Sequence, residues 1–359
     1  MDTYLKINSK QALLFCTELF KSYGFNGEES RIISDVLLSA DFAGIESHGV
    51  QRIVRYHDEI VSGCVDVRAE PENVFQTDIS AVIDAHKAMG QLAGVQAMHD
   101  ACLKAKRHGF GIVSVRNSNH IGICGYYAEI ASKEGLIGIC MTNSEAIAVP
   151  TFGCKGMLGT NAIAFAMDAS PAPFSFDIST TVVPRGKIEV YAKNRENLPA
   201  GWAVDTAGRE TVSPSEVIQN IVHKSGGGIL PLGGAGTLTG GHKGFGLGII
   251  VDIFTGVLSG GLTSNHVNLV KGETGIANCF IALDCNLFGN PQEIKERLSC
   301  FLQELRDSPK AEGCERIFTP GEKKAELTAQ RRKGTIPVSE STLKELREIA
   351  ACQGIEFII

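Results

Sequence analysis

A serine, a histidine and an arginine lie close together in the segment GIESHGVQR, residues 44–52. Ser47 and His48 are adjacent, and Arg52 follows four residues after the histidine. An imidazole can gain or lose a proton near neutral pH, and a guanidinium can bind a carboxylate through two parallel hydrogen bonds. This combination is suited to proton transfer on a substrate that carries a carboxylate group.

The same three residues also have structural interpretations. Ser47 precedes a helical pattern, and serine commonly caps the N-terminus of a helix. On that helix His48 and Arg52 would share one face of the first turn, and the histidine could simply bond a backbone carbonyl. A serine-hydrolase pair is disfavoured, because adjacent residues in a turn rarely direct their side chains at each other. The residue pattern alone leaves chemistry and structure both open.

Two further segments could bind a ligand. His120, in NSNHIGICGYY, follows an apolar strand pattern and precedes a helical one, so it is expected in a loop that faces either a ligand or the core. In GGHKGFG, glycines would let the backbone approach a phosphate beside Lys243, although glycines also allow close helix packing.

Several common chemistries are absent from the sequence. No GxGxxG motif occurs in a strand–turn–helix setting, and the phosphate-binding P-loop, HExxH and GxSxG motifs are missing. The nine histidines fall in no metal-ligand spacing, so no metal is expected. Neither a Rossmann dinucleotide fold nor a metallohydrolase is therefore predicted.

Charge and apolar patterning limit the partners. The net charge of -6 and the lack of a long basic block argue against nucleic acid. Scattered charges at the N-terminus indicate no signal peptide, and the apolar window at residues 244–261 contains Asp252 and many glycines. This window is expected to be a buried element, with no membrane contact. The 11 cysteines form no CxxC pair and are expected to be buried thiols in the reducing cytoplasm.

Hydrophobic periodicity outlines the elements. Apolar spacings of three and four residues predict helices at both chain ends, over residues 11–24, 28–44, 50–63, 290–307 and 341–354. Between them, residues 101–120 and 129–146 repeat one pattern: a helix, a glycine, an apolar strand and an asparagine-containing end. Such a repeat indicates helix–strand units on a shared sheet, with polar strand ends where ligands commonly bind.

Further strands are predicted over residues 162–169, 174–180 and 187–193. We therefore expect an α/β fold with two domains. A small helical domain would combine residues 1–75 with the C-terminal segment 310–359, and residues 76–309 would form the α/β domain.

An ordered series of motifs resembles one known family. The segments ESHGVQR, VRNSNHIGICGYYA, GTNAIAFA, FDISTTVVPRGKIEVY, GWAVD, LPLGG, GGHKGFGLGIIVDIFTGVLSGG and TPGE occur in this order. They resemble the type-2 malate/L-lactate dehydrogenases, most of all the malate dehydrogenases among them, from about residue 10 to the C-terminus. The resemblance implies a non-Rossmann fold, with an α/β domain that binds NAD or NADP and a small helical domain. It also implies a homodimer that moves a hydride between NAD(P)H and a 2-oxo or 2-hydroxy acid, above all malate and oxaloacetate.

The resemblance also assigns roles to residues. His48 matches the catalytic acid–base, with a pKa near neutral expected for that role, and Ser47 matches its proton-relay neighbour. The matched substrate contacts are Arg52, His120, Thr160, Arg185 and Gly186. The matched cofactor contacts are His120, Ile121, Gly122, Ile123, Cys124, Asp177, Ile178, Ser179, His242, Lys243, Pro320, Gly321 and Glu322.

Some features depart from the family pattern or leave the substrate open. The segment at residues 211–228 differs from the commoner continuation, and Lys187 replaces an acid found in the imine-reducing branch, which counts against an imine substrate. Lactate, ureidoglycolate, sulfolactate or a sugar-derived keto acid are the alternative substrates. Arg185 and Arg116 are candidates for binding the far end of the substrate. A non-catalytic binding protein is the remote alternative, disfavoured because His48 and Arg52 are both present.

Overall fold

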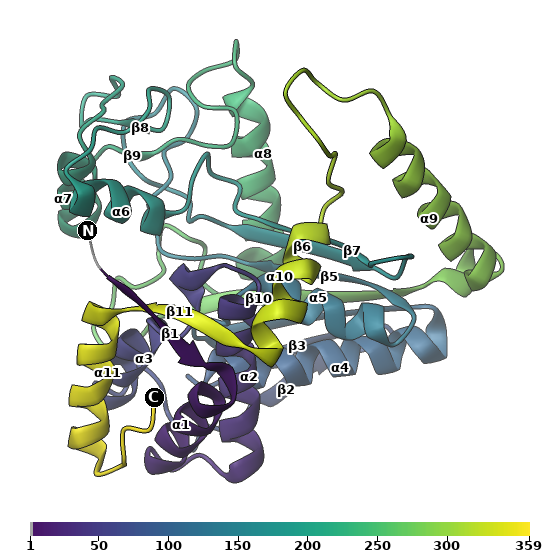
Figure 1. The fold of residues 1–359 in the computed structure, drawn as a ribbon, viewed down its shortest axis with the longest axis horizontal. Coiled ribbons are helices and arrows are strands. Elements are labelled where there is room, and N and C mark those ends of the chain that lie inside the picture. Colours follow the sequence, from purple (N-terminus) through teal and green to yellow (C-terminus); the bar gives the residue numbers. More distant parts are fainter. Residues whose placement is uncertain (1–2) are drawn as a thin grey trace.

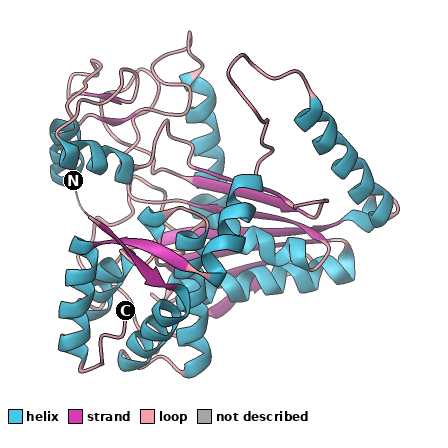
Figure 2. Cartoon of the chain, viewed as in Figure 1, coloured by secondary structure: helices cyan, strands magenta, loops and turns pink. Residues whose placement is uncertain are grey.

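The computed structural model describes residues 3–359, and its largest sheet, which has seven strands, lies at the centre (Figures 1 and 2). The strands are β1 (Tyr4–Asn8), β2 (Glu72–Gln76), β3 (Ser80–Asp84), β4 (Phe110–Ser118), β5 (Leu136–Thr142), β6 (Ala162–Met167), β7 (Phe174–Ile178), β8 (Ala203–Val204), β9 (Gly228–Ile229), β10 (Ile276–Asp284) and β11 (Thr335–Ser339). The helices are α1 (Ser9–Ser22), α2 (Gly27–Phe42), α3 (Arg52–Val61), α4 (Gly90–His108), α5 (Cys124–Lys133), α6 (Arg185–Asn194), α7 (Pro214–His223), α8 (Gly241–Asp252), α9 (Pro291–Asp307), α10 (Glu322–Lys333) and α11 (Glu340–Gln353).

The central sheet has the strand order β2-β3-β4-β10-β5-β6-β7. Only the β3–β4 pair is parallel, and β10 is antiparallel to both β4 and β5. The two helix–strand units predicted from the repeat, α4–β4 and α5–β5, therefore share one sheet, as expected, but β10 lies between them. A mixed sheet of this order differs from a doubly wound Rossmann sheet, which agrees with the missing GxGxxG motif.

Two main hydrophobic cores organise the chain. One buries α4 and α5 against β3, β4, β5, β6 and β10, with Phe280 and Tyr127 at its centre. The second core combines buried residues between Ala12 and Val65 with others from β11 and α11 in the C-terminal segment. The strand pair β1–β11 joins the two chain ends, and α11 packs with α1, α2 and α3 in this core, whereas α9 contributes no residue to it.

The helix predictions at the chain ends are confirmed in position. α1, α2, α3, α9 and α11 overlap the predicted ranges, and Pro291 occupies the first turn of α9 after the Asn290 cap. Gly63 follows the end of α3 with a φ of 74°, the left-handed conformation that favours glycine.

The strand predicted over residues 187–193 is wrong, because this segment belongs to helix α6. Its alternating apolar residues do not share a buried face: Ile188 is fully buried and Val190 is exposed. Pro184 at the N-cap position starts the helix, and Ile188 and Tyr191 then pack three residues apart in a small cluster with Trp202.

The apolar window at residues 244–261 is buried on one side only. It forms α8 followed by a π-helical turn at Ile253–Val257. Val251 of α8 and Phe254 of this turn pack on the sheet face opposite α4. On the other side Leu247, Ile250 and Val257 are exposed. The expectation of a wholly buried element is therefore wrong for a single chain. None of the described helices is long and apolar enough to span a membrane.

The cysteines are free but not all buried. Cys154, Cys300, Cys314 and Cys352 are exposed, so the expectation of buried thiols is wrong for these four. Two of them lie on the outer faces of α9 and α11, which the core does not cover.

Candidate active site

A cavity of about 390 Å³ lies at the sheet edge where β4 and β5 end. Because β10 pairs with both strands, the loops that follow Ser118 and Thr142 come out beside each other. The start of α3 and the start of α6 form the other walls. Seven of the residues assigned from the sequence line this cavity: Ser47, His48, Arg52, His120, Thr160, Arg185 and Gly186.

Ser47 and His48 lie in a 3₁₀ turn, Glu46–His48, and not in a helix. The prediction that Ser47 caps α3 is wrong, since α3 begins at Arg52 with Gln51 at the N-cap position. His48 and Arg52 therefore do not share a helical turn, although both face the cavity. The tight turn brings Ser47 Oγ to 2.9 Å from His48 Nδ1, so the expectation that these neighbours would point apart is also wrong. This contact leaves His48 Nε2 for a substrate.

The His48 ring has an unusual electrostatic environment. Burial, assisted by Arg52 and Arg55, lowers the pKa of His48 to about 3. The imidazole is therefore neutral at physiological pH. The near-neutral pKa expected from the sequence is wrong, because the ring is buried beside two guanidinium groups.

Arg52 supports the same turn. Its Nε donates a hydrogen bond of 2.5 Å to the Ser47 carbonyl oxygen, five residues earlier. Burial, with the positive charge of Arg55, lowers the pKa of Arg52. Because Nε is the atom used for this bond, the terminal guanidinium nitrogens are left for a ligand in the cavity.

His120 is held against His48. Its Nδ1 accepts hydrogen bonds from Tyr56 Oη at 2.7 Å and from the Gly122 N–H at 3.3 Å, so the proton of the neutral ring belongs on Nε2. The His48 and His120 rings stack, with centroids 5.4 Å apart. Burial, followed by the charge of Arg55, holds the pKa of His120 well below its usual range. Two neutral imidazoles therefore face one cavity.

The remaining cavity residues come from the opposite wall. The Thr160 N–H donates to Ser144 Oγ at 3.1 Å, which joins the loop after β5 to the segment before β6. A Cβ placed at Gly186 would lie 3.4 Å from the Ser47 side chain, so α6 begins in direct contact with the 3₁₀ turn. Arg185 pairs through Nε with Glu189 at 2.8 Å.

Three of the segments assigned to the cofactor converge beside the N-terminus of α5. The Gly125 N–H donates to Asp177 Oδ2 at 2.7 Å, and the Ser175 N–H donates to the Pro320 carbonyl oxygen at 3.2 Å. Ile121, Ile123 and Cys124 are buried in the protein interior. Any cofactor contact from residues 121–124 must therefore come from main-chain atoms.

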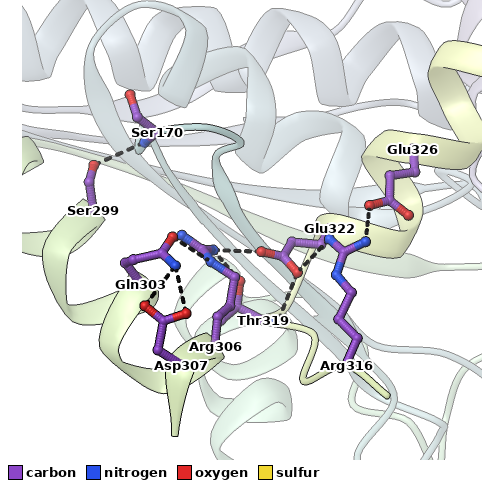
Figure 3. Close-up of polar contacts among 9 residues, drawn as sticks. All are labelled: Ser170, Ser299, Gln303, Arg306, Asp307, Arg316, Thr319, Glu322 and Glu326. Atoms are coloured by element: carbon purple, nitrogen blue, oxygen red, sulfur yellow. Dashed lines mark hydrogen bonds and ion pairs between the residues drawn. The ribbon is translucent and has the colours of Figure 1, made fainter.

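The Glu322 carboxylate already forms ion pairs with two arginines. Figure 3 shows it between Arg306, with which it forms a 2.5 Å ion pair, and Arg316, at 3.4 Å, close to Thr319. Burial favours a higher value, but hydrogen bonds from Arg306 and Thr319 hold the pKa of Glu322 below its usual range. The residues around Gly321, whose φ of 99° is left-handed, are thus fixed by this cluster. The Glu322 carboxylate is held within this cluster, and the Pro320 and Gly321 carbonyl oxygens already accept the Ser175 and Ala325 N–H groups.

His242 and Lys243 lie apart from the cavity, exposed in the first turn of α8. No side chain caps this helix, whose N-cap residue is Gly240 in the left-handed conformation, with a φ of 90°. Uncapped N–H groups next to a lysine are suited to a phosphate. The residues present therefore fit a dinucleotide with a charged pyrophosphate.

Sequence reasoning missed Arg55, Glu59 and Glu145, which also line the cavity. Helical spacing was the available signal, because Arg55 lies three residues after Arg52, and Glu59 four residues after Arg55. The suggestion that Arg116 reaches the substrate is wrong, since Arg116 binds Asp84 and the Ser259 carbonyl oxygen outside the cavity.

Comparisons with known proteins agree with this arrangement. The chain is 42% identical to a malate dehydrogenase of Pyrococcus abyssi over 356 residues, which cover 99% of this chain and 97% of the relative. It is 32% identical to an L-sulfolactate dehydrogenase of Methanocaldococcus jannaschii, with coverages of 98% and 97%. It is 30% identical to a ureidoglycolate dehydrogenase (NAD(+)) of Escherichia coli O157:H7, with coverages of 83% and 82%.

The fold has a close match among solved structures. The crystal structure of malate dehydrogenase from Entamoeba histolytica superposes with a TM-score of 0.96 at 31% identity, covering 99% of this chain and 100% of the other. A sequence model described as malate/L-lactate dehydrogenase matches residues 7–347. The chain therefore belongs to the malate/L-lactate dehydrogenase family, and its fold is the non-Rossmann fold of that family.

Proposed function

We propose that this protein is an NAD(P)-dependent 2-hydroxy acid dehydrogenase that interconverts malate and oxaloacetate. The observation that carries the proposal is the convergence of His48, His120 and Arg52 on one cavity. The 42% identity to a malate dehydrogenase supports the choice of substrate. The cofactor is NAD or NADP, whose nicotinamide supplies or accepts the hydride.

The proposed role of Arg52 is to bind the 1-carboxylate of the substrate. Its side chain is fixed by the bond to the Ser47 carbonyl oxygen, so a carboxylate bound by the terminal nitrogens has a defined position relative to His48. Such positioning accelerates the reaction by holding the carbonyl carbon where the hydride is delivered.

The proposed role of His48 is proton transfer at the substrate oxygen. In malate oxidation the neutral ring accepts the hydroxyl proton through Nε2, and the lowered pKa of His48 keeps the ring unprotonated before that step. In oxaloacetate reduction the ring must first hold a proton. Binding of an anionic substrate offsets the charges of Arg52 and Arg55, which raises the pKa of His48 and favours that form.

Ser47 is proposed to orient the His48 ring and to relay its proton, because Oγ contacts Nδ1 at 2.9 Å. His120 is proposed to donate from Nε2 to the substrate, with Tyr56 fixing the ring. Thr160, Arg185 and Gly186 are proposed to complete the substrate site.

The cofactor is proposed to bind along the main chain of residues 121–124, 177–179 and 320–322, and at the His242–Lys243 turn. The bonds that join the first three segments support this assignment. The uncapped N-terminus of α8 supports the fourth.

We further propose a homodimer in the cytoplasm. Leu247, Ile250 and Ile253 form part of an apolar surface on α8, and a helix that is apolar on all sides is normally covered.

The division into domains 1–75 with 310–359, and 76–309, also remains a proposal. It is supported by the core that joins both chain ends.

Replacement of His48 tests the function. His48→Asn should lower kcat/KM for oxaloacetate by roughly 10²- to 10⁴-fold, the usual contribution of a general acid or base. Unfolding temperature and quenching of NADH fluorescence on binding should stay near wild-type values. His86→Asn, at a half-exposed histidine outside the cavity, is the matched control. A folded His48→Asn enzyme with near-normal turnover would exclude the proton-transfer role.

A substrate panel tests the choice of malate. Initial rates with oxaloacetate, pyruvate and other 2-oxo acids, each with NADH and NADPH, should favour oxaloacetate. Saturation by pyruvate without saturation by oxaloacetate would reject the malate assignment while keeping the dehydrogenase.

A further inference from the structure

The cavity contains more cationic groups than one carboxylate requires. Arg52, Arg55 and Arg185 all line it. Arg52 donates through Nε to a carbonyl oxygen and not to an acid. The other two pair through Nε with a glutamate four residues later. Each arginine thus keeps its terminal nitrogens for other partners, and one substrate carboxylate accounts for only one of them.

Arg55 lies beside Arg52 on the same face of α3. Residues three apart on a helix have Cβ atoms about 5–6 Å apart, so both guanidinium groups reach one ligand of a few carbon atoms. Two like charges in this arrangement repel each other, and burial makes the repulsion stronger. A doubly negative ligand would remove this cost.

Arg55 is also held rigidly. Its Nε lies 2.7 Å from Glu59 Oε1, and the Glu59 side chain is only 12% exposed. The other Glu59 oxygen is buried without a hydrogen-bond partner, so this glutamate has no second task among the described residues. Arg55 lines the cavity with 39% of its own side chain accessible. An arginine that is fixed through Nε and partly accessible can bind an anion through its terminal nitrogens.

The charge of Arg55 reaches the reacting groups. It contributes to the lowered pKa of both His48 and His120, and for His120 its effect is the largest after burial. Arg185 lies on the opposite wall, with a partner glutamate that is 47% exposed and therefore well screened. Of the two remaining arginines, Arg55 is the one placed beside Arg52 and beside the His48 and His120 rings.

Resting on the proposed function, we infer that Arg55, fixed by Glu59, binds a second negative group of the substrate. Arg52 takes the 1-carboxylate, and Arg55 takes the distal carboxylate, which two carbon atoms separate from the first. The enzyme thereby selects short 2-oxo acids that carry a second anion, carboxylate or sulfonate, over those that end in a methyl group.

The test compares two substrates that differ only at the far end: oxaloacetate and 2-oxobutyrate, in which a methyl group replaces the distal carboxylate. Arg55→Gln should lower kcat/KM for oxaloacetate by roughly 10- to 150-fold, the loss of a charged hydrogen-bonding partner. The value for 2-oxobutyrate should change little. Sulfopyruvate should lose as much as oxaloacetate, because its sulfonate replaces the distal carboxylate.

Arg185→Gln tests the competing cavity arginine, since Arg185 has the same i,i+4 pairing on the other wall. It should leave the ratio of the two substrates near the wild-type value. Arg55→Lys keeps the charge but loses the planar edge, so an intermediate ratio is expected. This milder variant also provides a result if Arg55→Gln does not fold, as judged by its unfolding temperature.

Two results would overturn the inference: an equal loss for both substrates in Arg55→Gln, or a selective loss of oxaloacetate in Arg185→Gln only. Failure of the proposed function would look different. In that case the wild-type enzyme itself would reduce no 2-oxo acid, whatever the residue at position 55.

Discussion

The surroundings of His48, more than the intrinsic pKa of an imidazole, determine the charge of its ring. A free imidazole titrates near pH 6.5, yet burial and two arginines lower the pKa of His48 to about 3. In its proposed role the ring therefore meets the substrate neutral, as the base for hydroxy acid oxidation. Proton uptake is expected to accompany the binding of an anionic 2-oxo acid, because the ligand charge reverses the effect of the arginines.

The same shift predicts a pH-dependent stability. Below pH 6.5 the unfolded chain takes up a proton at His48, whereas the folded chain takes it up only near pH 3. The free energy of unfolding should thus fall as the pH decreases from 6.5 towards 3, by up to about 1.4 kcal/mol per pH unit from this residue. His48→Asn should show a shallower decline in urea unfolding between pH 6.5 and 4.

The control for this experiment is His223→Asn, since His223 is exposed at the end of α7. Its stability profile should follow the wild-type profile. Identical slopes for wild type and His48→Asn would contradict the lowered pKa.

At the scale of elements, the turn between α2 and α3 positions Ser47 and His48, the proposed catalytic residues. The buried Asp41, near the end of α2, accepts a hydrogen bond of 2.8 Å from the Val50 N–H. Gly49 lies so close that a Cβ there would be 1.9 Å from Asp41 Oδ1. Arg331 of α10 binds the Asp41 carbonyl oxygen, so the C-terminal segment holds the turn as well.

Gly49→Ala should therefore damage both stability and activity. The new methyl group must displace the Asp41 carboxylate, which leaves the buried Val50 N–H unpaired at a cost of about 1–3 kcal/mol. The accompanying shift of His48 should reduce kcat/KM by about 100-fold. Thermal unfolding and oxaloacetate reduction measure the two effects.

Gly246→Ala in α8 is the matched control, because a Cβ there meets no atom within 4 Å. It should leave activity unchanged and stability equal or slightly higher, since alanine favours the helix. Normal stability in Gly49→Ala would show that Asp41 does not hold the turn as described.

At the scale of the whole molecule, one chain leaves an apolar surface uncovered. Ile250, Ile253 and Val257 lie three and four residues apart on the outer side of α8 and the π-helical turn, and all are exposed. On the other side the same helix packs on the central sheet, whose edge forms the cavity. Association of two chains through this surface would bury it.

Ile250→Glu should consequently weaken the proposed dimer. A buried carboxylate in an apolar interface is costly unless it is paired. Sedimentation at micromolar concentration should show a monomer or a mixed population, and the unfolding temperature should fall. Exposed Val222→Glu, on α7, is the control and should sediment as wild type. A monomeric wild-type protein would reject the dimer itself.

The sequence by itself determined the helices at both ends, the repeated helix–strand units and the SHGVQR group, because hydrophobic spacing and motif order are local properties.

Tertiary structure decided the rest. Residues 187–193 alternate like a strand but become α6, since only packing shows which side is buried. β10 enters between β4 and β5 from more than 130 residues further along the chain, which no local pattern reveals. That pairing brings His120 and Ser144 together, and burial beside Arg52 and Arg55 then sets the pKa of His48. Both effects depend on residues distant in sequence, so only the folded chain fixes them.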